Sequence, residues 1–172
     1  MNEKIKVLIT LEDDEKITLE LYPDVAPKTV ANFLQLVDNK FYDGVIFHRI
    51  IKDFMVQTGG YYLDGNDLHL KEEIPSIMGE FSENGFENNL KHTFGVISMA
   101  RTSDPNSASS QFFICTNNTP HLDGSYAAFG KTVDEESNKV LRKLNQATTS
   151  PIHPTLTDFP IPPITIKSIR RI

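Results

Sequence analysis

Apolar and polar residues alternate in two short runs near the start of the chain and in one at its end, and this period of two constrains the fold more than any other feature. In the run at 5–11 every second residue is apolar, and the run at 17–21 repeats the pattern after the acidic stretch EDDE. Successive side chains of a β-strand point to opposite faces, so each run predicts a strand with one buried face. Together the two runs predict a β-hairpin.

Further strands are predicted where β-branched and aromatic residues gather. They occur in VIFHRII, FMVQ, FGVISMA (94–100), QFFICT (111–116), AAFGK and the closing ITIKSIRRI. The stretch 61–90 has mixed signals and predicts a long, partly ordered connection. The stretch 148–163 is too rich in proline for regular structure. Strands that follow one another without a helix between each pair indicate an antiparallel barrel or sandwich.

Only two segments have the period of a helix, and we expect them at the ends of the barrel or sandwich. The first is APKTVANFLQLVDNK, where Pro27 fits a first helical turn. The second is VDEESNKVLRKLNQA, with acidic residues in its first turn and basic residues near its end, as the helix dipole favours. In the second helix we expect the apolar residues to face inward, namely Val133, Val140, Leu141 and Leu144.

Length and composition indicate a globular protein of one domain, residues 1–172. The chain is 39% hydrophobic and 23% charged, which is ordinary for such a domain. No apolar stretch approaches the roughly 20 residues that span a bilayer, and the N-terminus lacks the pattern of a signal peptide. We therefore expect a cytoplasmic protein with no membrane partner.

The net charge limits the kinds of partner that we expect, and the cysteine count indicates the redox compartment. The net charge of −6 argues against a nucleic-acid partner, which usually meets a basic surface. Cys115 is the single cysteine, so no intrachain disulfide can form, which fits a reducing compartment. Because Cys115 lies in QFFICT, we interpret it as a small buried apolar residue.

Motifs of covalent, metal and cofactor chemistry are missing from the sequence. There is no phosphate-binding glycine loop, no dinucleotide-binding fingerprint and no G-x-S-x-G nucleophile elbow. The five histidines, at 48, 69, 92, 121 and 153, do not have the spacing of metal ligands. We expect no metal and no cofactor.

The stretch FHRIIKDFMVQTGG, residues 47–60, places a permanently charged arginine and one glutamine within a strongly apolar run. An arginine on a solvated face, in a surface ion pair, would be the ordinary explanation. An arginine at the rim of an apolar pocket would instead indicate a functional site, and the run alone leaves both open.

Two stretches together resemble the cyclophilins, a family of peptidyl-prolyl cis-trans isomerases. FHRIIKDFMVQTGG is similar to the family pattern F-H-R-x-I-x-x-F-M-x-Q-x-G-D, and residues 98–131 carry SQFFI and LDG…FGK in the family's order and spacing. The pieces APKTVANFL, YDGVIFHR and GEFSENGFENNLKHTFGVISMAR agree as well. The likeness runs from about residue 5 to 146, and the last strand also fits the family.

The resemblance implies an eight-stranded antiparallel closed β-barrel capped by two α-helices, and prolyl isomerase activity on unfolded or flexible chains. It places Arg49 beside an apolar proline pocket, with the peptide held on either side of the proline. The catalytic residues that it implies are Arg49, Phe54, Gln57 and Phe113. The substrate-binding residues that it implies are Met55, Ala100, Arg101, Gln111, His121, Leu122 and Tyr126.

The chain departs from the eukaryotic pattern at the pocket. His121 stands where most eukaryotic members carry a tryptophan that contributes to cyclosporin binding, so the resemblance implies a weakened affinity for that drug. Arg101 and Tyr126 look like the short cytosolic bacterial members. Tyr61 replaces the aspartate that usually follows the paired glycines.

Two alternatives to a catalyst remain. One is a proline-peptide binding module without turnover, against which the retained Arg49, Gln57 and Phe113 argue. The other is a barrel scaffold within a larger assembly, which the lack of any additional interaction domain disfavours. We expect a monomer whose partners are proline-containing polypeptides.

Overall fold

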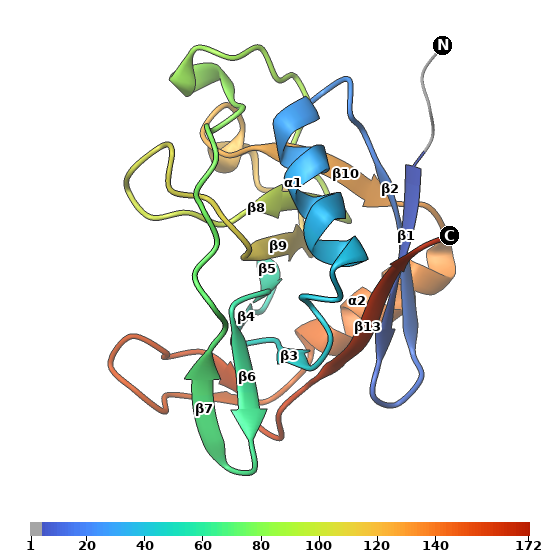
Figure 1. The fold of residues 1–172 in the computed structure, drawn as a ribbon. Coiled ribbons are helices and arrows are strands. Elements are labelled where there is room, and N and C mark those ends of the chain that lie inside the picture. Colours follow the sequence, from blue (N-terminus) through green and yellow to red (C-terminus); the bar gives the residue numbers. More distant parts are fainter. Residues whose placement is uncertain (1–4) are drawn as a thin grey trace.

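The computed structural model describes residues 5–172. The expectation that the N-terminus lacks a signal peptide rests in part on residues 1–4, which lie outside the described residues. Figure 1 shows the order of the elements. The strands of the main sheet are β1 Ile5–Leu11, β2 Lys16–Leu21, β4 Arg49–Ile51, β5 Met55–Thr58, β8 Val96–Met99, β9 Phe112–Cys115, β10 Ala128–Thr132 and β13 Ile166–Arg171. The helices are α1 Pro27–Asp38 and α2 Glu135–Asn145, with short 3-10 turns at Ser82–Asn84 and Pro120–Leu122.

The eight strands form one antiparallel sheet in the order β13-β1-β2-β10-β8-β9-β5-β4. The eight-stranded antiparallel sheet and the two helices expected from the sequence are thereby confirmed. The sheet curls until the segment before β4 reaches β13. There Gly44 N donates to Ile166 O at 2.8 Å and Phe47 N donates to Ile164 O at 3.0 Å.

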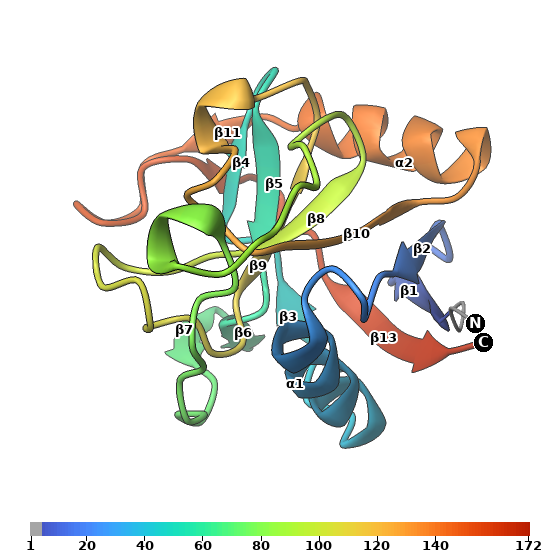
Figure 2. The same ribbon diagram turned by 90° about the horizontal axis from the view of Figure 1, so that it is seen from above.

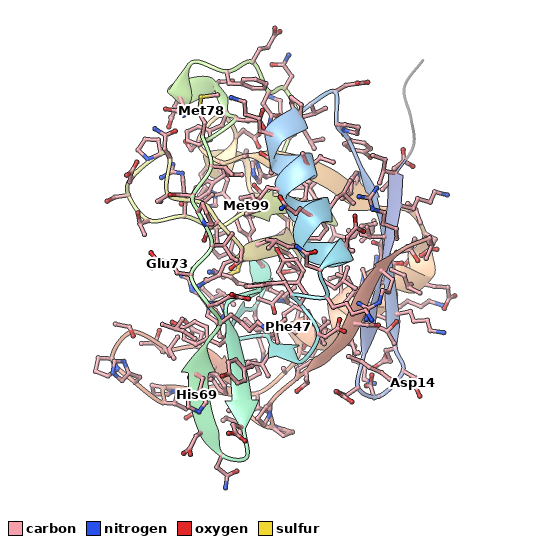
Figure 3. The ribbon with its side chains drawn as sticks, in the orientation of Figure 1. Asp14, Phe47, His69, Glu73, Met78 and Met99 are labelled. Atoms are coloured by element: carbon pink, nitrogen blue, oxygen red, sulfur yellow. The ribbon has the colours of Figure 1, made fainter. Side chains whose placement is uncertain are left out.

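Alternation gives the sheet its two faces. On β9 and β5 the residues Phe112, Ile114 and Val56 point into the main core, together with Ile97 and Met99 of β8. Figure 3 labels Met99 and Phe47 within the body of the molecule, and both are fully buried. The neighbouring residues on each strand point to the opposite face, which carries the site described below.

The two helices lie on opposite sides of the curled sheet, as Figure 2 shows. On α1, Phe33 packs against Phe112 and Phe129 with ring centroids 5.3 Å apart in both cases. Ala26, the N-cap residue of α1, offers no side-chain hydrogen bond, and Glu80 from a distant loop caps the first turn instead. Its Oε1 accepts hydrogen bonds from the backbone N and the hydroxyl of Thr29, both at 2.7 Å.

The helix α2 begins after Asp134, whose carboxylate accepts a hydrogen bond from Ser137 N at 2.9 Å. Leu141 and Leu144 are buried against the core and Val140 is partly buried, as expected. The expectation for Val133 was wrong. Val133 precedes the cap, lies outside the helix and is 38% exposed.

The connection 61–90 contains more regular structure than its sequence indicates. Strands β6 Tyr61–Asp64 and β7 Asp67–Leu70 form a hairpin around Gly65, and β6 pairs with β3 Val45–Ile46. Gly65 adopts φ +62°, a left-handed conformation that suits glycine. The hairpin was missed because few of its residues are buried, so its sequence shows little alternation. The proline-rich stretch also holds a short pair, β11 Thr149–Ser150 with β12 Phe159–Pro160.

No helix within residues 5–172 combines the length and the apolar composition needed to cross a membrane.

Candidate functional site

A second, smaller apolar cluster lies on the face of the sheet opposite the main core. Its buried members are Met55, Val96, Phe113, Cys115, Leu122 and Ala128. Register explains why they meet, because Met55 lies opposite Cys115 and Gln57 lies opposite Phe113. Arg49 of β4 lies opposite Gln57, so Arg49 belongs to the same face. Cys115 is fully buried here, and burial raises the pKa of its thiol to about 11, which confirms its interpretation as an apolar residue.

This cluster forms the floor of a pocket of about 110 Å³. Nine of the eleven residues expected at the site line it: Arg49, Phe54, Met55, Gln57, Ala100, Arg101, Phe113, Leu122 and Tyr126. Gln111 and His121 do not line the pocket but lie next to it. Gln111 Oε1 accepts a hydrogen bond from Gln57 Nε2 at 3.1 Å, and the ring of His121 lies 5.6 Å from that of Phe54.

Arg49 stands at the rim of this pocket and is exposed, whereas the next residue, Ile50, is buried in the core. Its one side-chain hydrogen bond within residues 5–172 runs from NH1 to Gln57 Oε1, and at 3.4 Å it is long. None of the ion pairs formed by the described residues includes Arg49. The guanidinium therefore keeps most of its donors available beside an apolar surface.

The turn between β4 and β5 is held from outside the hairpin. Asn145, at the end of α2, accepts a hydrogen bond from Asp53 N at 2.9 Å and donates one to Ile51 O at 3.0 Å. On the other side Thr116 N donates to Phe54 O at 2.9 Å. These bonds fix Phe54 relative to Arg49. Sequence reasoning missed Asn145, because a buried amide at a helix end has no local sequence signal.

The paired glycines after β5 let the neighbouring chain approach closely. A Cβ on Gly60 would lie 2.5 Å from Gln111 Nε2, and one on Gly59 would lie 2.6 Å from Ser110 O. Any larger side chain would therefore displace Gln111, which links to Gln57.

Arg101 builds the far wall of the pocket with its side chain. The guanidinium lies between the rings of Phe81 and Tyr126, 4.9 and 4.6 Å from their centroids. Its Nε and NH2 donate to Ser125 O at 3.2 and 2.6 Å. Tyr126 in turn meets Phe113 edge-on, with centroids 5.7 Å apart. Arg101 thus holds Tyr126 against the pocket floor.

A buried histidine, His92, supports the site from behind. His92 Nε2 lies 2.9 Å from Ser98 Oγ, and its Nδ1 lies 3.1 Å from Asp123 Oδ1. Its ring stacks behind Phe113 at 6.1 Å. Burial lowers the pKa of His92, although Asp123 acts in the opposite direction. This supporting role of His92 could not be assigned from the sequence.

His48 is 4% exposed, and its Nδ1 has no hydrogen-bond partner among the described residues. Its ring lies 4.7 Å from that of Tyr61. Burial, and then the neighbouring charge of Arg49, lower the pKa of His48 to about 4. Both buried imidazoles are therefore neutral near pH 7. Among residues 5–172 no group of three histidine, cysteine, aspartate or glutamate side chains is placed to hold a metal ion.

Comparison with known proteins assigns the family. The family model described as cyclophilin type peptidyl-prolyl cis-trans isomerase/CLD matches residues 6–171. The chain is 42% identical over 163 residues to peptidyl-prolyl cis-trans isomerase-like 3 of Gallus gallus, covering 92% of this chain and 94% of that one. It is 39% identical over 159 residues to peptidyl-prolyl cis-trans isomerase A of Dickeya dadantii, covering 90% and 78%.

The fold agrees with the same family. A cyclophilin type peptidyl-prolyl cis-trans isomerase of Cryptosporidium parvum, solved in the presence of the dipeptide Ala-Pro, matches with a TM-score of 0.73 and 30% identity. That match covers 96% of this chain and 97% of the other. The expected isomerase class is confirmed, and the chain belongs to the cyclophilin-type peptidyl-prolyl cis-trans isomerase family.

Proposed function

We propose that residues 1–172 act as a single domain that speeds rotation about X–Pro bonds in unfolded or flexible chains, and so assists protein folding in the cytoplasm. The observation that carries this proposal is the position of Arg49. Its guanidinium has no carboxylate partner among residues 5–172 and stands at the rim of a small pocket with an apolar floor.

The chemistry requires a donor and an orienting pocket, with no proton transfer. Rotation about the X–Pro bond crosses roughly 20 kcal/mol, because resonance keeps the amide planar. Reducing times of tens to hundreds of seconds to milliseconds takes about five decades, or about 7 kcal/mol. In the twisted transition state the prolyl nitrogen regains its lone pair. A donor aimed at that nitrogen stabilises the twisted amide more than either planar form.

Each lining residue has a part in this proposal. Phe54, Met55, Phe113 and Leu122 hold the proline ring, and the pocket they line supports that role. Arg49 donates to the prolyl nitrogen, for which its permanent charge and fixed fork are suited. Gln57 and the backbone at Arg101 hold the peptide on either side of the proline. Ala100 and Gln111 line the adjoining groove. Tyr126 forms a wall of the proline pocket, and His121 lies at the mouth of that pocket.

The alternative is a module that binds proline-containing polypeptides without turning them over. The related parasite protein was solved with Ala-Pro present, which fits proline-peptide binding under either function. We also propose that the chain acts as a monomer, without metal or cofactor, and that it binds cyclosporin weakly because His121 replaces the usual indole.

A coupled isomerisation assay on a short X–Pro peptide distinguishes the two functions. We expect Arg49→Ala to lower kcat/KM by about two to three decades, the usual loss when one well-placed donor is removed. Arg171→Ala is the control, because it removes another exposed arginine whose partner is Asp38, away from the pocket. Its turnover should match the wild type. Near-normal turnover by folded Arg49→Ala would refute the role of Arg49, and a wild type that binds the peptide without turnover would favour the alternative.

A further inference from the structure

A second concavity, which shares no residue with the proline pocket, lies where the β1–β2 turn, the end of α2 and the segment 161–165 meet. Its volume is about 360 Å³. We name it the α2 groove, lined by Leu11, Glu12, Asp13, Glu15, Lys143, Leu144, Ala147, Thr148, Ile161, Pro162, Pro163, Ile164 and Thr165.

The α2 groove has an apolar floor that is open to solvent on one side. Leu11 and Leu144 are buried at its base, and Ile161 is 44% exposed at its edge beside two exposed prolines. Large apolar side chains that gather at a surface concavity are typical of an interaction site. The concavity is large enough to receive one or two aliphatic or aromatic side chains of a partner.

The rim of the groove is acidic. Glu12, Asp13 and Glu15 face a single lysine, Lys143, whose ammonium is already paired with Glu15 at 2.7 Å. Glu12 and Asp13 form none of the ion pairs seen among residues 5–172. Asp14, labelled in Figure 3 at the tip of the same turn, pairs with Lys167 at 3.5 Å. Three carboxylates therefore share one ammonium beside the apolar floor, which leaves the rim with an excess of negative charge.

We propose that the α2 groove is a docking surface for a peptide segment in which lysine or arginine flanks large apolar side chains. The apolar residues of the partner lie against Leu11, Leu144 and Ile161. Its cationic groups meet Glu12 and Asp13, so the charges of the two surfaces are complementary. The surface shares no residue with the proline pocket, and a partner bound here leaves that pocket open.

The test uses proline-free peptides, so that the proline pocket does not compete. Uniformly ¹⁵N-labelled protein is titrated with an acetylated, amidated peptide of alternating lysine and leucine, and with a second peptide in which glutamate replaces lysine. We expect the cationic peptide to shift the amides of Thr148, Ile164 and Thr165 in a saturable manner, and the anionic peptide to leave them unchanged. Arg49→Ala should bind the cationic peptide as the wild type does.

A charge variant tests the rim. Glu12→Gln with Asp13→Asn removes two of the three carboxylate charges at the rim, and the asparagine keeps an oxygen for the hydrogen bond that Asp13 accepts from Glu15 N. We expect its Kd for the cationic peptide to rise at least about fivefold. The matched control is Glu72→Gln with Glu73→Gln, the same charge change at exposed residues far from Asp14 in Figure 3. Its Kd should stay within about twofold of the wild type.

Three results would overturn the proposal. The first is the absence of saturable shifts at the groove with the cationic peptide at millimolar concentration. The second is equal binding of the anionic peptide, which would remove the role of the acidic rim. The third is an equal loss of affinity in the control variant, which would reduce the effect to the net charge of the protein.

Discussion

The burial of His48 predicts a loss of folding stability on mild acidification that replacement of this one residue removes. In the folded protein the pKa of His48 is lowered from 6.5 to about 4 by burial and by the charge of Arg49. The unfolded chain binds a proton at His48 as the pH falls below about 6.5, and the folded protein does so only near 4. Because the unfolded state holds more protons in this window, stability declines as the pH falls from about 6.5 to 4.

The size of the effect follows from the two pKa values. At pH 7.5 both states are neutral at His48 and the contribution is close to zero. At pH 5 the unfolded imidazole is almost fully protonated and the folded one is almost fully neutral, which costs about 2 kcal/mol of unfolding free energy. That is a large part of the stability of an ordinary domain.

Urea unfolding of the wild type and of His48→Gln at pH 7.5 and pH 5.0 measures this term. At pH 7.5 the unfolding free energy of the variant differs from that of the wild type, because the contact of the imidazole ring with Tyr61 is lost. For this reason only the change in unfolding free energy between the two pH values is compared. We expect the wild type to lose about 2 kcal/mol more than the variant between the two pH values. His153→Gln, at an exposed position, is the control and should follow the wild type. An equal loss in wild type and His48→Gln would refute the reasoning.

Three further predictions concern the rate, the drug and the cap of α1. Because burial lowers the pKa of both His48 and His92, kcat/KM should be nearly flat between about pH 6 and 8, and a limb titrating near 6.5 would contradict catalysis without proton transfer. His121→Trp should tighten cyclosporin binding at least about fivefold in calorimetry, by adding apolar surface and a fixed N–H donor, and should change peptide turnover less than about threefold. Unchanged drug affinity would mean that the drug does not contact this position. Glu80→Ala should lower the urea-derived unfolding free energy by about 2–4 kcal/mol, because both donors of Thr29 lose their buried acceptor, and a loss below about 1 kcal/mol would contradict the capping role.

The sequence predicted the strands and helices that alternation or helical period specifies. It did not predict the strands whose formation depends on contacts between distant segments. Strand β9 was recognisable by a different signal, because aromatic and β-branched residues gather in a strand that is buried on both faces. The β6–β7 hairpin was not, because it lies largely at the surface and its strands are fixed by pairing with β3.

The residues of the candidate site likewise fall into those that the sequence predicted and those that it did not. The lining residues could be listed through resemblance to a family, since their types and spacing are local features of the sequence. The residues that hold them in place could not be listed, because Asn145 reaches the β4–β5 turn from a helix more than ninety residues away. The side chain of Arg101 likewise finds Phe81 across another loop. Hydrogen bonds between distant segments leave no periodic signal.

The position of Arg49 at the edge of the sheet explains why this support matters. Strand β4 is an edge strand of the eight-stranded sheet, paired on one side with β5. On the other side Ile50 N donates to Asp158 O at 3.0 Å, which supplies a single additional bond. An edge strand of three residues is weakly fixed by its ladder alone, whereas the role that we propose for Arg49 requires its donor to be placed within about half an ångström.

Asn145 supplies additional support, because its hydrogen bonds join the β4–β5 turn to α2. Leu141 and Leu144 of α2 are buried in the main core. The position of Arg49 is thereby fixed through contacts with the core and not by the edge strand itself. It follows that the placement of the guanidinium depends on a helix that contributes no residue to the pocket lining, and that the rigidity of the site is a property of the whole fold.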